Sequence, residues 1–423
     1  MKTLIFAVAG YNLAETSRHI EIAKACRAHF DILFLSYGGQ FERFIEAEGF
    51  TLHKMEPRLT KEKLNSLKAV LRGETLNTVG YFNAKELSVR VKNEVEFFRK
   101  KQPAAVLTGW CLSVLLSARA AKVPLVNVLH STSIREYYEA GLQSFPDNLN
   151  YGFLRWFVSQ VKLDNCFSGR VLRASFPTRP YNSVGAEYGL PPFNNFIEVL
   201  EPDHILLADI PSWVNLPKLR PKVHHIGPLV AKLALDIPAE IGEMPRDRPI
   251  IYFAMGSSGS PQTIKEIISG FRNKPYRVIA PVKALVEKSD FDVPSNVIVT
   301  GFIPAHVVNP LASLSVIHGG QNTVMNACLS GTPIVGVGNH PEQQANLDAC
   351  VRKGFAIRIR KRELTAAAVL EAIDSLLHDP KAHRAVQNFK EQLMQWDGPN
   401  NAAQFLLRTF GSNLREKEGE SKI

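Results

Sequence analysis

The chain has 423 residues, of which 45% are hydrophobic and 21% are charged, and its formal net charge is +10. This length exceeds what a single core of ordinary size supports and predicts two domains, and the composition excludes a disordered, collagen-like or coiled-coil protein. No run approaches the roughly 18 apolar residues of a membrane span, and five scattered cysteines without a CxxC pair argue against a disulfide scaffold or zinc knuckle.

The first half of the chain alternates short apolar runs with amphipathic segments. The run at 3–9 follows Lys2 and imitates a short secretory signal. It is shorter than a usual signal core and leads through a glycine turn into an amphipathic segment, so we interpret it as a buried strand of a cytoplasmic protein. We expect strands at 3–9, 31–37, 104–108 and 124–129, and helices at 17–30 and 112–121.

The second half repeats this rhythm. We expect strands at 249–255, 277–280, 297–300, 315–318 and 333–337, and helices at 262–271 and 323–330. Fully apolar strands that alternate with helices are typical of parallel sheets covered on both faces. The sequence therefore predicts an α/β fold with two doubly wound, Rossmann-like domains that face each other across a cleft.

Prolines and a helix break suggest where the domains divide. The stretch 217–248 carries five prolines and little periodicity, so we place an N-terminal domain at 1–225 and a C-terminal domain at 226–395. A helical stretch at 381–410 is interrupted at Asp397-Gly398-Pro399. We expect a helix at 396–411 that returns to the first domain, and a frayed, charged tail at 412–423.

Three loops of the second half follow predicted strands, where a parallel sheet binds ligands. The first loop carries Ser257 and Ser258 between glycines, and the third carries the acid–amide pair Glu342-Gln343. The second, from His318 to Thr323, opens a helix with Gly319 and Gly320, which allow backbone amides to approach an anion at the positive end of the helix dipole. These amides, with donors from His318, Asn322 and Thr323, suit a diphosphate without requiring a metal.

Taken together, these segments resemble the UDP-glycosyltransferase superfamily, which has the GT-B fold. The resemblance is carried by Gly301-Phe302-Ile303-Pro304, His318-Gly319-Gly320-x-Asn322-Thr323, Gly331-x-Pro333 and Glu342-Gln343-x-x-Asn346. It is clear over 249–359, where the interval from His318 to Glu342 equals the family's interval from its histidine to its Asp-Gln pair. Ile226-Gly227-Pro228-Leu229 also looks like the linker entry of bacterial members.

The resemblance implies a role for each matching residue. Phe302 would stack on the uracil and the backbone of Ile303 would read its edge, while Ser257, Ser258 and the loop of Gly319, Gly320, Asn322 and Thr323 beside His318 would hold the diphosphate. Glu342 and Gln343 would bind the sugar hydroxyls. Two positions depart from the family pattern: Asn326 replaces a glutamate that binds the ribose, and Glu342 replaces an aspartate. An amide bonds a hydroxyl less strongly than a carboxylate does, so the sequence specifies the identity of the nucleotide less well than it specifies the fold.

An inverting sugar transfer needs a base that takes the proton of the acceptor hydroxyl. In the family this is often a histidine in a Gly-His-x-x-Arg-like loop after the first strand. If Arg18 matches that arginine, the histidine position holds Glu15, and His19 is the alternative base. A carboxylate whose pKa is raised by burial could serve; equally, Glu15 could be a helix N-terminal acid and His19 a surface residue.

The resemblance thus implies an inverting, metal-independent hexosyltransferase that moves a sugar from a nucleotide donor, UDP by the family pattern, to a hydroxyl of a hydrophobic or lipid-like acceptor. Aromatic residues at 137–138, 145, 151–157 and 193–196 are compatible with an apolar acceptor channel or with a packed helical insertion. The positive charge permits contact with an anionic membrane, and no nucleic acid partner or separate cofactor is predicted. Two alternatives are a UDP-sugar 2-epimerase and an inactive nucleotide-sugar-binding protein.

Overall fold

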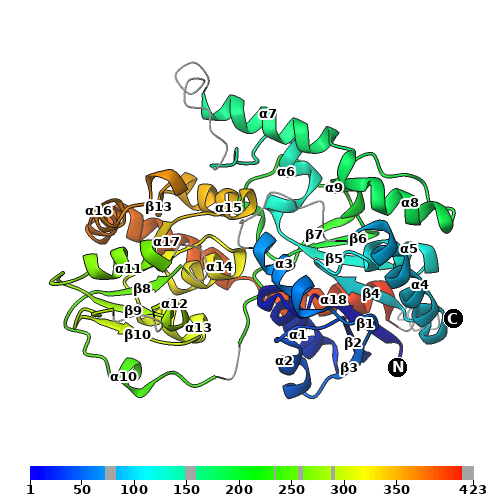
Figure 1. Ribbon diagram of the computed structural model, residues 1–423, viewed down its shortest axis with the longest axis horizontal. Coiled ribbons are helices and arrows are strands. Elements are labelled where there is room, and N and C mark those ends of the chain that lie inside the picture. The colour runs from blue at the N-terminus through cyan, green and yellow to red at the C-terminus, as the bar shows by residue number, and fades with distance from the viewer. Residues whose placement is uncertain (72–81, 148–158, 233–234, 256–260, 287–290, 412–423) are drawn as a thin grey trace, which may run out of the picture. The chain divides into compact units, whose positions relative to one another are not determined.

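The structure is a computed structural model that describes residues 1–71, 82–147, 159–232, 235–255, 261–286 and 291–411 (Figure 1). By its internal contacts the chain divides into two compact units. The first unit comprises 1–140, 168–231 and 396–423, and the second comprises 141–167 and 232–395.

The described part of the first unit contains a seven-stranded parallel sheet in the order β3-β2-β1-β4-β5-β6-β7. The order reverses direction between β1 and β4, and this switch point is where open α/β sheets bind ligands. The strands are β1 Thr3–Ala7, β2 Asp31–Ser36, β3 Thr51–Lys54, β4 Ala105–Thr108, β5 Leu125–Leu129, β6 His204–Leu207 and β7 Val223–His225.

Helices cover both faces of this sheet (Figure 1). They are α1 Leu13–Cys26, α2 Glu42–Ala47, α3 Lys61–Leu71, α4 Ala84–Lys101, α5 Val114–Ala121, α6 Arg135–Glu139, α8 Arg179–Glu187, α9 Phe196–Val199 and α18 Gly398–Phe410; α7 Gln160–Arg173 spans the boundary between the two contact-based units.

The first helix begins four residues before its predicted start at 17. Asn12 caps it, because its side-chain oxygen accepts hydrogen bonds from the backbone N–H groups of Ala14 and Glu15 at 3.1 and 3.4 Å. An asparagine in extended conformation is a favoured N-cap residue. The cap places Glu15 in the first turn, directly beyond the end of β1.

The C-terminal helix α18 packs on α1. Its apolar face, with Ala402, Leu406 and Phe410, shares one buried core with Ile20 and Ala23 of α1. Asp397 caps it by accepting from the N–H of Asn400 at 3.2 Å, and α17 Pro380–Met394 ends just before. The helix break predicted at 397–399 is therefore present, whereas the predicted tail at 412–423 lies outside the described residues.

The described part of the second unit contains a six-stranded parallel sheet in the order β10-β9-β8-β11-β12-β13, with its switch point between β8 and β11. The strands are β8 Ile250–Ala254, β9 Arg277–Ala280, β10 Val297–Val299, β11 Leu314–Ile317, β12 Ile334–Gly336 and β13 Ala356–Arg358. The helices are α10 Ala239–Gly242, α11 Pro261–Gly270, α12 Lys283–Val286, α13 Ala305–Val308, α14 Gln321–Ser330, α15 Pro341–Arg352, α16 Ala366–Leu377 and α17.

Two parallel sheets with helices on their faces confirm the predicted fold class. The sequence patterns missed four strands, namely β3, β6, β7 and β13. Three of these lie at sheet edges and the fourth, β6, lies beside an edge. Edge strands are short and half exposed, so they carry polar residues such as His53, His224 and Arg358 that interrupt the apolar runs by which a buried strand is recognised.

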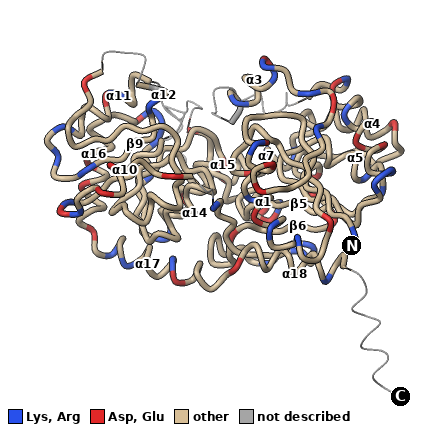
Figure 2. The backbone as a smooth tube through the Cα atoms, turned by 90° about the horizontal axis from the view of Figure 1, so that it is seen from below, with Lys and Arg blue, Asp and Glu red and all other residues tan. Residues whose placement is uncertain are grey.

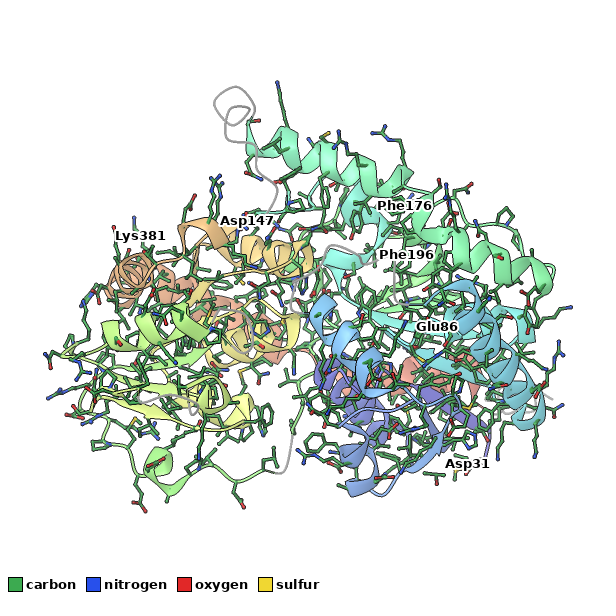
Figure 3. The ribbon with its side chains drawn as sticks, viewed as in Figure 1. Asp31, Glu86, Asp147, Phe176, Phe196 and Lys381 are labelled. Carbon is green, nitrogen blue, oxygen red and sulfur yellow. The ribbon has the colours of Figure 1, made fainter. Side chains whose placement is uncertain are left out.

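A short segment at 141–147 groups with the second unit, although the predicted first domain, 1–225, included it. The Gln143 amide donates to the Pro341 carbonyl at 3.0 Å, and the Ser144 hydroxyl donates to Asp348 at 2.6 Å. Asp147, labelled in Figure 3, accepts from the guanidinium of Arg358 at 3.0 Å. These polar contacts attach the segment to α15 and β13. They join residues about 200 positions apart in the chain, so local sequence patterns do not predict them.

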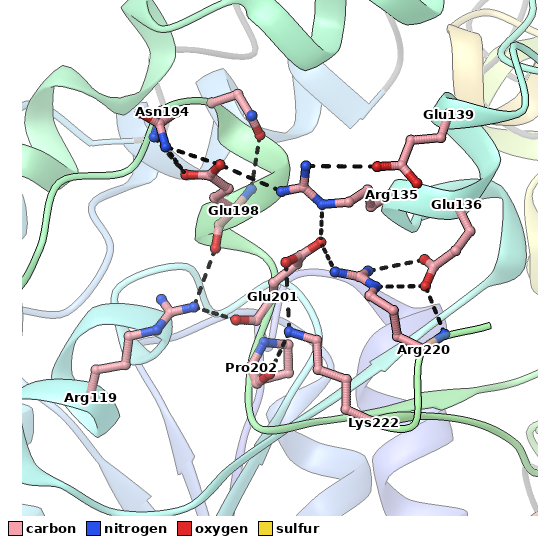
Figure 4. Close-up of polar contacts among 11 residues, drawn as sticks. Arg119, Arg135, Glu136, Glu139, Asn194, Glu198, Glu201, Pro202, Arg220 and Lys222 are labelled. Atoms are coloured by element: carbon pink, nitrogen blue, oxygen red, sulfur yellow. Dashed lines mark hydrogen bonds and ion pairs between the residues drawn. The ribbon is translucent and has the colours of Figure 1, made fainter.

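In the first unit, a network of ion pairs connects α6, α9 and the segment that leads into β7 (Figure 4). Glu201 is at its centre and accepts from Arg135 and Arg220, each at 2.7 Å. Burial acts most strongly on Glu201 and would raise its pKa, but the hydrogen bonds from both arginines hold the pKa below its ordinary value.

Changing Glu201 to glutamine is expected to lower the free energy of unfolding at pH 7 by about 1–2 kcal/mol, since two charge-assisted hydrogen bonds are weakened at a partly solvated site. A carboxylate with a depressed pKa stabilises the fold above its unfolded pKa, and this contribution disappears as the pH falls through the lower folded value. Urea unfolding at pH 7 and pH 3 measures both effects. Glu139→Gln is the control, because Glu139 is 55% exposed and 4.0 Å from Arg135; an equal loss in both variants would contradict the prediction.

Lysine and arginine alternate with aspartate and glutamate along both units instead of forming one block of a single sign (Figure 2).

No helix in the described part of the chain has the length and hydropathy that crossing a bilayer requires.

Candidate active site

The loop after β11 is shaped by two glycines. Gly319 has a φ of +82°, and a Cβ placed there would lie 2.6 Å from the Gln343 carbonyl oxygen and 2.7 Å from Leu347 Cγ. Gly320 is the N-cap of α14 and offers no side-chain cap. The first backbone N–H groups of α14 therefore lack the usual capping partner and point outward from the helix end, as anion binding requires.

His318 lies at the switch point of the second unit. Its Nδ1 is 3.5 Å from the carbonyl oxygen of Ala254, the last residue of β8. Because a carbonyl only accepts, this contact places the ring hydrogen on Nδ1 and turns Nε2 toward Gly320, where an added Cβ would be only 2.7 Å away. Burial lowers the pKa of His318, and a bound diphosphate would oppose that shift by favouring the charged ring.

Helix α15 brings the predicted sugar-binding acid to the same loop. Asn346 donates from Nδ2 both to the Gly319 carbonyl, at 3.1 Å, and to Glu342 Oε1, at 2.9 Å. Asn346 is fully buried, whereas the Glu342 side chain remains 34% exposed. The structure therefore brings the glycine loop and Glu342 together, as the sequence predicted, and one amide joins them.

Two further predicted residues have part of their hydrogen-bonding capacity already in use. Gln343 Oε1 accepts from the N–H of Asn339 at 2.9 Å, so Nε2 remains to donate to a ligand. Asn326 donates from Nδ2 to the Asn322 carbonyl at 2.8 Å and is only 4% exposed. Its Oδ1 remains to accept from one ligand hydroxyl, and as a neutral amide oxygen it accepts less strongly than the glutamate of the family pattern would.

The loop after β10 holds Phe302 and Ile303 in contrasting environments. Phe302 is 60% exposed, while Ile303 is 4% exposed and anchors the loop. An exposed aromatic ring at the carboxyl end of a strand is free to stack on a nucleobase. Thr323 lies in the first turn of α14, partly exposed, and Ser257 and Ser258 lie outside the described residues.

Replacing Phe302 with alanine is expected to weaken UDP binding by about tenfold or more, because stacking of a base on an aromatic side chain contributes about 1–3 kcal/mol. Calorimetry should show this loss for UDP and no loss for inorganic pyrophosphate. Phe176, also exposed (56%) and labelled in Figure 3, supplies the matched control. Unchanged UDP affinity in Phe302→Ala would remove the residue from the base site.

In the first unit, Glu15 lies at the switch point between β1 and β4. Its Oε1 accepts from the backbone N–H of Trp110 at 2.8 Å, while Oε2 is buried without a hydrogen-bond partner among the described residues. Burial, only partly offset by the Trp110 N–H and by Arg18, raises the pKa of Glu15 from 4.5 to about 7. This value suits a general base at neutral pH.

His19 lies one helical turn further along α1 and faces the protein core. Its Nδ1 bonds the Glu15 carbonyl at 2.9 Å, and its ring meets Phe6 edge-on with centroids 6.2 Å apart. Burial lowers the pKa of His19 to about 4, so the ring is neutral. The possibility that His19 is a surface residue is wrong, since it has no exposed area. The two candidates thus differ in position: Glu15 is at the ligand edge of the sheet and His19 is behind it.

Sequence reasoning did not assign roles to several polar residues at these strand ends. Asn346 was visible only as part of a motif, although its spacing of four from Glu342 places both on one helix face. Arg18 contacts His130, and Asp209 bonds both Ser131 and His225, at 2.7 and 3.0 Å. These contacts join residues far apart in the chain and leave no local signal.

Comparisons with known proteins agree with this geometry. Residues 276–408 match the family described as Erythromycin biosynthesis protein CIII-like, C-terminal domain. The PGL/p-HBAD biosynthesis rhamnosyltransferase of Mycobacterium bovis (strain BCG / Pasteur 1173P2) is 27% identical over 315 residues, which cover 72% of this chain and 66% of that protein. The NDP-glycosyltransferase YjiC of Bacillus subtilis (strain 168) is 28% identical over 160 residues, 37% of this chain and 41% of that one.

Solved structures share the fold over almost the whole chain. The glycotransferase of kitacinnamycin superposes with a TM-score of 0.68 at 16% identity, covering 96% of this chain and 98% of that one. The glycosyltransferase VinC in complex with DTDP gives a TM-score of 0.67 at 18% identity, covering 97% and 99%. With the paired parallel sheets and the glycine loop joined to Glu342, these matches show that the chain has the GT-B fold and is similar to glycosyltransferases.

Proposed function

We propose that this protein is an inverting glycosyltransferase that uses a pyrimidine nucleoside diphosphate sugar and needs no metal ion. The observation that carries this proposal is the double hydrogen bond of Asn346, which holds the amide-lined glycine loop and the acid Glu342 beside one another. A diphosphate at the start of α14 would thus have its sugar next to a carboxylate that can bind hydroxyl groups.

The donor nucleotide follows from Phe302 and Asn326. Phe302 offers a stacking surface for a pyrimidine. Asn326 Nδ2 donates to the Asn322 carbonyl, which leaves the neutral Oδ1 to accept from a ribose 2′-hydroxyl, a weaker bond than a carboxylate would form. Structural neighbours were solved with DTDP (VinC) and with thymidine diphosphate (the spinosyn rhamnosyltransferase SpnG). We therefore extend the donor expected from the family pattern, UDP-sugar, to include dTDP-sugar.

The proposed reaction is a single displacement at the anomeric carbon. The acceptor hydroxyl oxygen forms a bond to this carbon as the bond to the diphosphate oxygen breaks, and Glu15 takes the hydroxyl proton. Attack opposite the leaving group inverts the anomeric configuration. The N–H groups at the start of α14 and the ring of His318 would stabilise the charge that develops on the departing diphosphate, which is why we propose no metal.

The acceptor we propose is hydrophobic or lipid-like. Relatives include a PGL/p-HBAD biosynthesis rhamnosyltransferase, and neighbours include glycosyltransferases of calicheamicin and spinosyn. The net charge of +10 would favour transient contact with an anionic membrane surface if the acceptor is presented there.

Incubation of the purified protein with UDP- and dTDP-sugars and a panel of hydrophobic alcohols and phenols, followed by mass spectrometry, tests the proposal. A product heavier by one sugar residue, formed in EDTA, supports it. An epimerised sugar nucleotide would instead identify a 2-epimerase, and binding without turnover would identify an auxiliary protein.

A further inference from the structure

A small cavity opens at the ligand edge of the first unit, beside Glu15. It is lined by the carboxyl-terminal ends of β1 and β4, including Tyr11 and Trp110, and by Tyr37, Phe82 and Arg90. Its water-accessible space is about 20 Å³, which holds one water-sized group. Trp110 connects this cavity to the candidate base, because its backbone N–H is the donor to Glu15.

Arg90 is the one cation among the described residues that line this cavity, where its neighbours are aromatic, aliphatic or small. It is 5% exposed, and its guanidinium carbon lies 3.7 Å from the ring centre of Tyr37 and 4.4 Å from that of Phe82. Among the residues that the structure describes, its guanidinium N–H groups have no hydrogen-bond partner. Because Arg90 lines the cavity, its N–H groups can donate to a ligand oxygen there, and such a charge-assisted hydrogen bond is favourable.

The nearest carboxylate does not fulfil this role. Glu94, one turn further along α4, is fully buried and accepts from the hydroxyls of Tyr37, Ser113 and Ser117 at 2.7, 2.6 and 2.6 Å. Its oxygens thus bond hydroxyl groups rather than Arg90. These bonds hold the Tyr37 ring in place against the guanidinium, so the cation is positioned by a rigid polar network.

We propose that Arg90 binds a carboxylate of the acceptor in this cavity, so that the enzyme selects hydroxylated aromatic acids. This inference rests on the proposed function in one respect, namely that the ligand is the sugar acceptor. The binding of a carboxylate by Arg90 is argued from the geometry of the cavity alone. The cavity has space for a terminal oxygen of a ligand, aromatic side chains form part of its lining, and the planar guanidinium presents paired N–H groups that match a carboxylate.

Binding of two shape-matched probes tests this directly. We expect 6-hydroxy-2-naphthoate to bind the full-length protein at least about tenfold more tightly than the neutral 6-hydroxy-2-naphthamide in calorimetry at pH 7.5, as expected for a charge-assisted hydrogen bond. Arg90→Met should abolish this preference, and Arg90→Lys should retain part of it. Lys92→Met removes an exposed cation two residues away on the same helix and should leave the preference intact.

Equal affinity of the wild-type protein for acid and amide would overturn the proposal, and so would a preference that survives in Arg90→Met. The wild-type comparison remains decisive even if that variant fails to fold. Because binding needs no sugar transfer, the two proposals fail separately: acid-selective binding without transfer from any donor contradicts only the glycosyltransferase, and transfer without acid selectivity contradicts only the role of Arg90.

Discussion

Replacing Glu15 with glutamine is expected to lower kcat by about 100-fold or more while leaving UDP affinity unchanged, the usual effect of losing a general base. Glutamine retains an oxygen that can accept from the Trp110 N–H, so the local structure should persist, but an amide cannot take the acceptor proton. Steady-state kinetics with a sugar donor, together with calorimetry of UDP, separates the two effects. Near-normal turnover would eliminate Glu15 from this role.

The pH profile distinguishes a base from a residue that only supports the structure. Burial raises the pKa of Glu15 to about 7, so the carboxylate that can accept a proton becomes populated as the pH rises through this value. We expect kcat/KM of the wild-type enzyme to rise over this range and then level off. Glu21→Gln, on the same helix but paired with Lys24, should keep that profile, and Glu15→Gln should lose it.

The same carboxyl group should reduce stability. A group whose folded pKa of about 7 exceeds its value of 4.5 in the unfolded chain favours folding below pH 4.5, and this contribution is lost as the pH rises through 7. The shift corresponds to about 3 kcal/mol. Glu15→Gln should therefore be more stable than the wild type at pH 8, with no such gain at pH 4, in thermal unfolding experiments. A buried charge retained at a cost to stability is expected of a functional residue.

The second unit could be predicted in detail because its signals are local. Each loop follows an apolar strand directly, and two glycines between His318 and the next helix specify a turn and a free helix end. The spacing of Glu342 and Asn346 places both on one face of α15, so the contact between them depends on residues four apart. Contacts between residues four apart can be predicted from sequence because helix geometry alone brings such residues together.

The acceptor side could be predicted only in outline. The bond from the Trp110 N–H to Glu15 joins residues from two different strand ends and depends on the strand order, which places β4 beside β1. Likewise, the segment at 141–147 joins the second unit through Asp147 and Arg358, more than two hundred residues apart. Matching Arg18 to the arginine of the family's loop suggested Glu15 as a candidate, but only packing shows that burial raises the pKa of Glu15 and that His19 faces the core.

Replacing Gly319 with alanine is expected to weaken UDP binding by about 100-fold or more and to lower the free energy of unfolding by about 2 kcal/mol or more. The left-handed conformation at this residue, with φ +82°, alone costs an alanine about 1–2 kcal/mol. The added methyl would also meet the Gln343 carbonyl and Leu347, both on α15, so this helix must move. Calorimetry with UDP and urea unfolding measure the two losses.

The matched control is Gly242→Ala, since Gly242 lies in the same unit and a Cβ there meets nothing within 4 Å. A double variant, Gly319→Ala with Leu347→Ala, separates the causes of the loss. It removes the side-chain clash, but the Gln343 carbonyl is backbone and remains 2.6 Å from the new methyl, so only part of the affinity should return. Full recovery would mean that Leu347 alone determines the loop geometry. If α15 moves, the Asn346 contacts that join Gly319 to Glu342 break, and a diphosphate site built on this loop must weaken. Undiminished UDP binding in Gly319→Ala would therefore mean that the diphosphate does not bind at this loop.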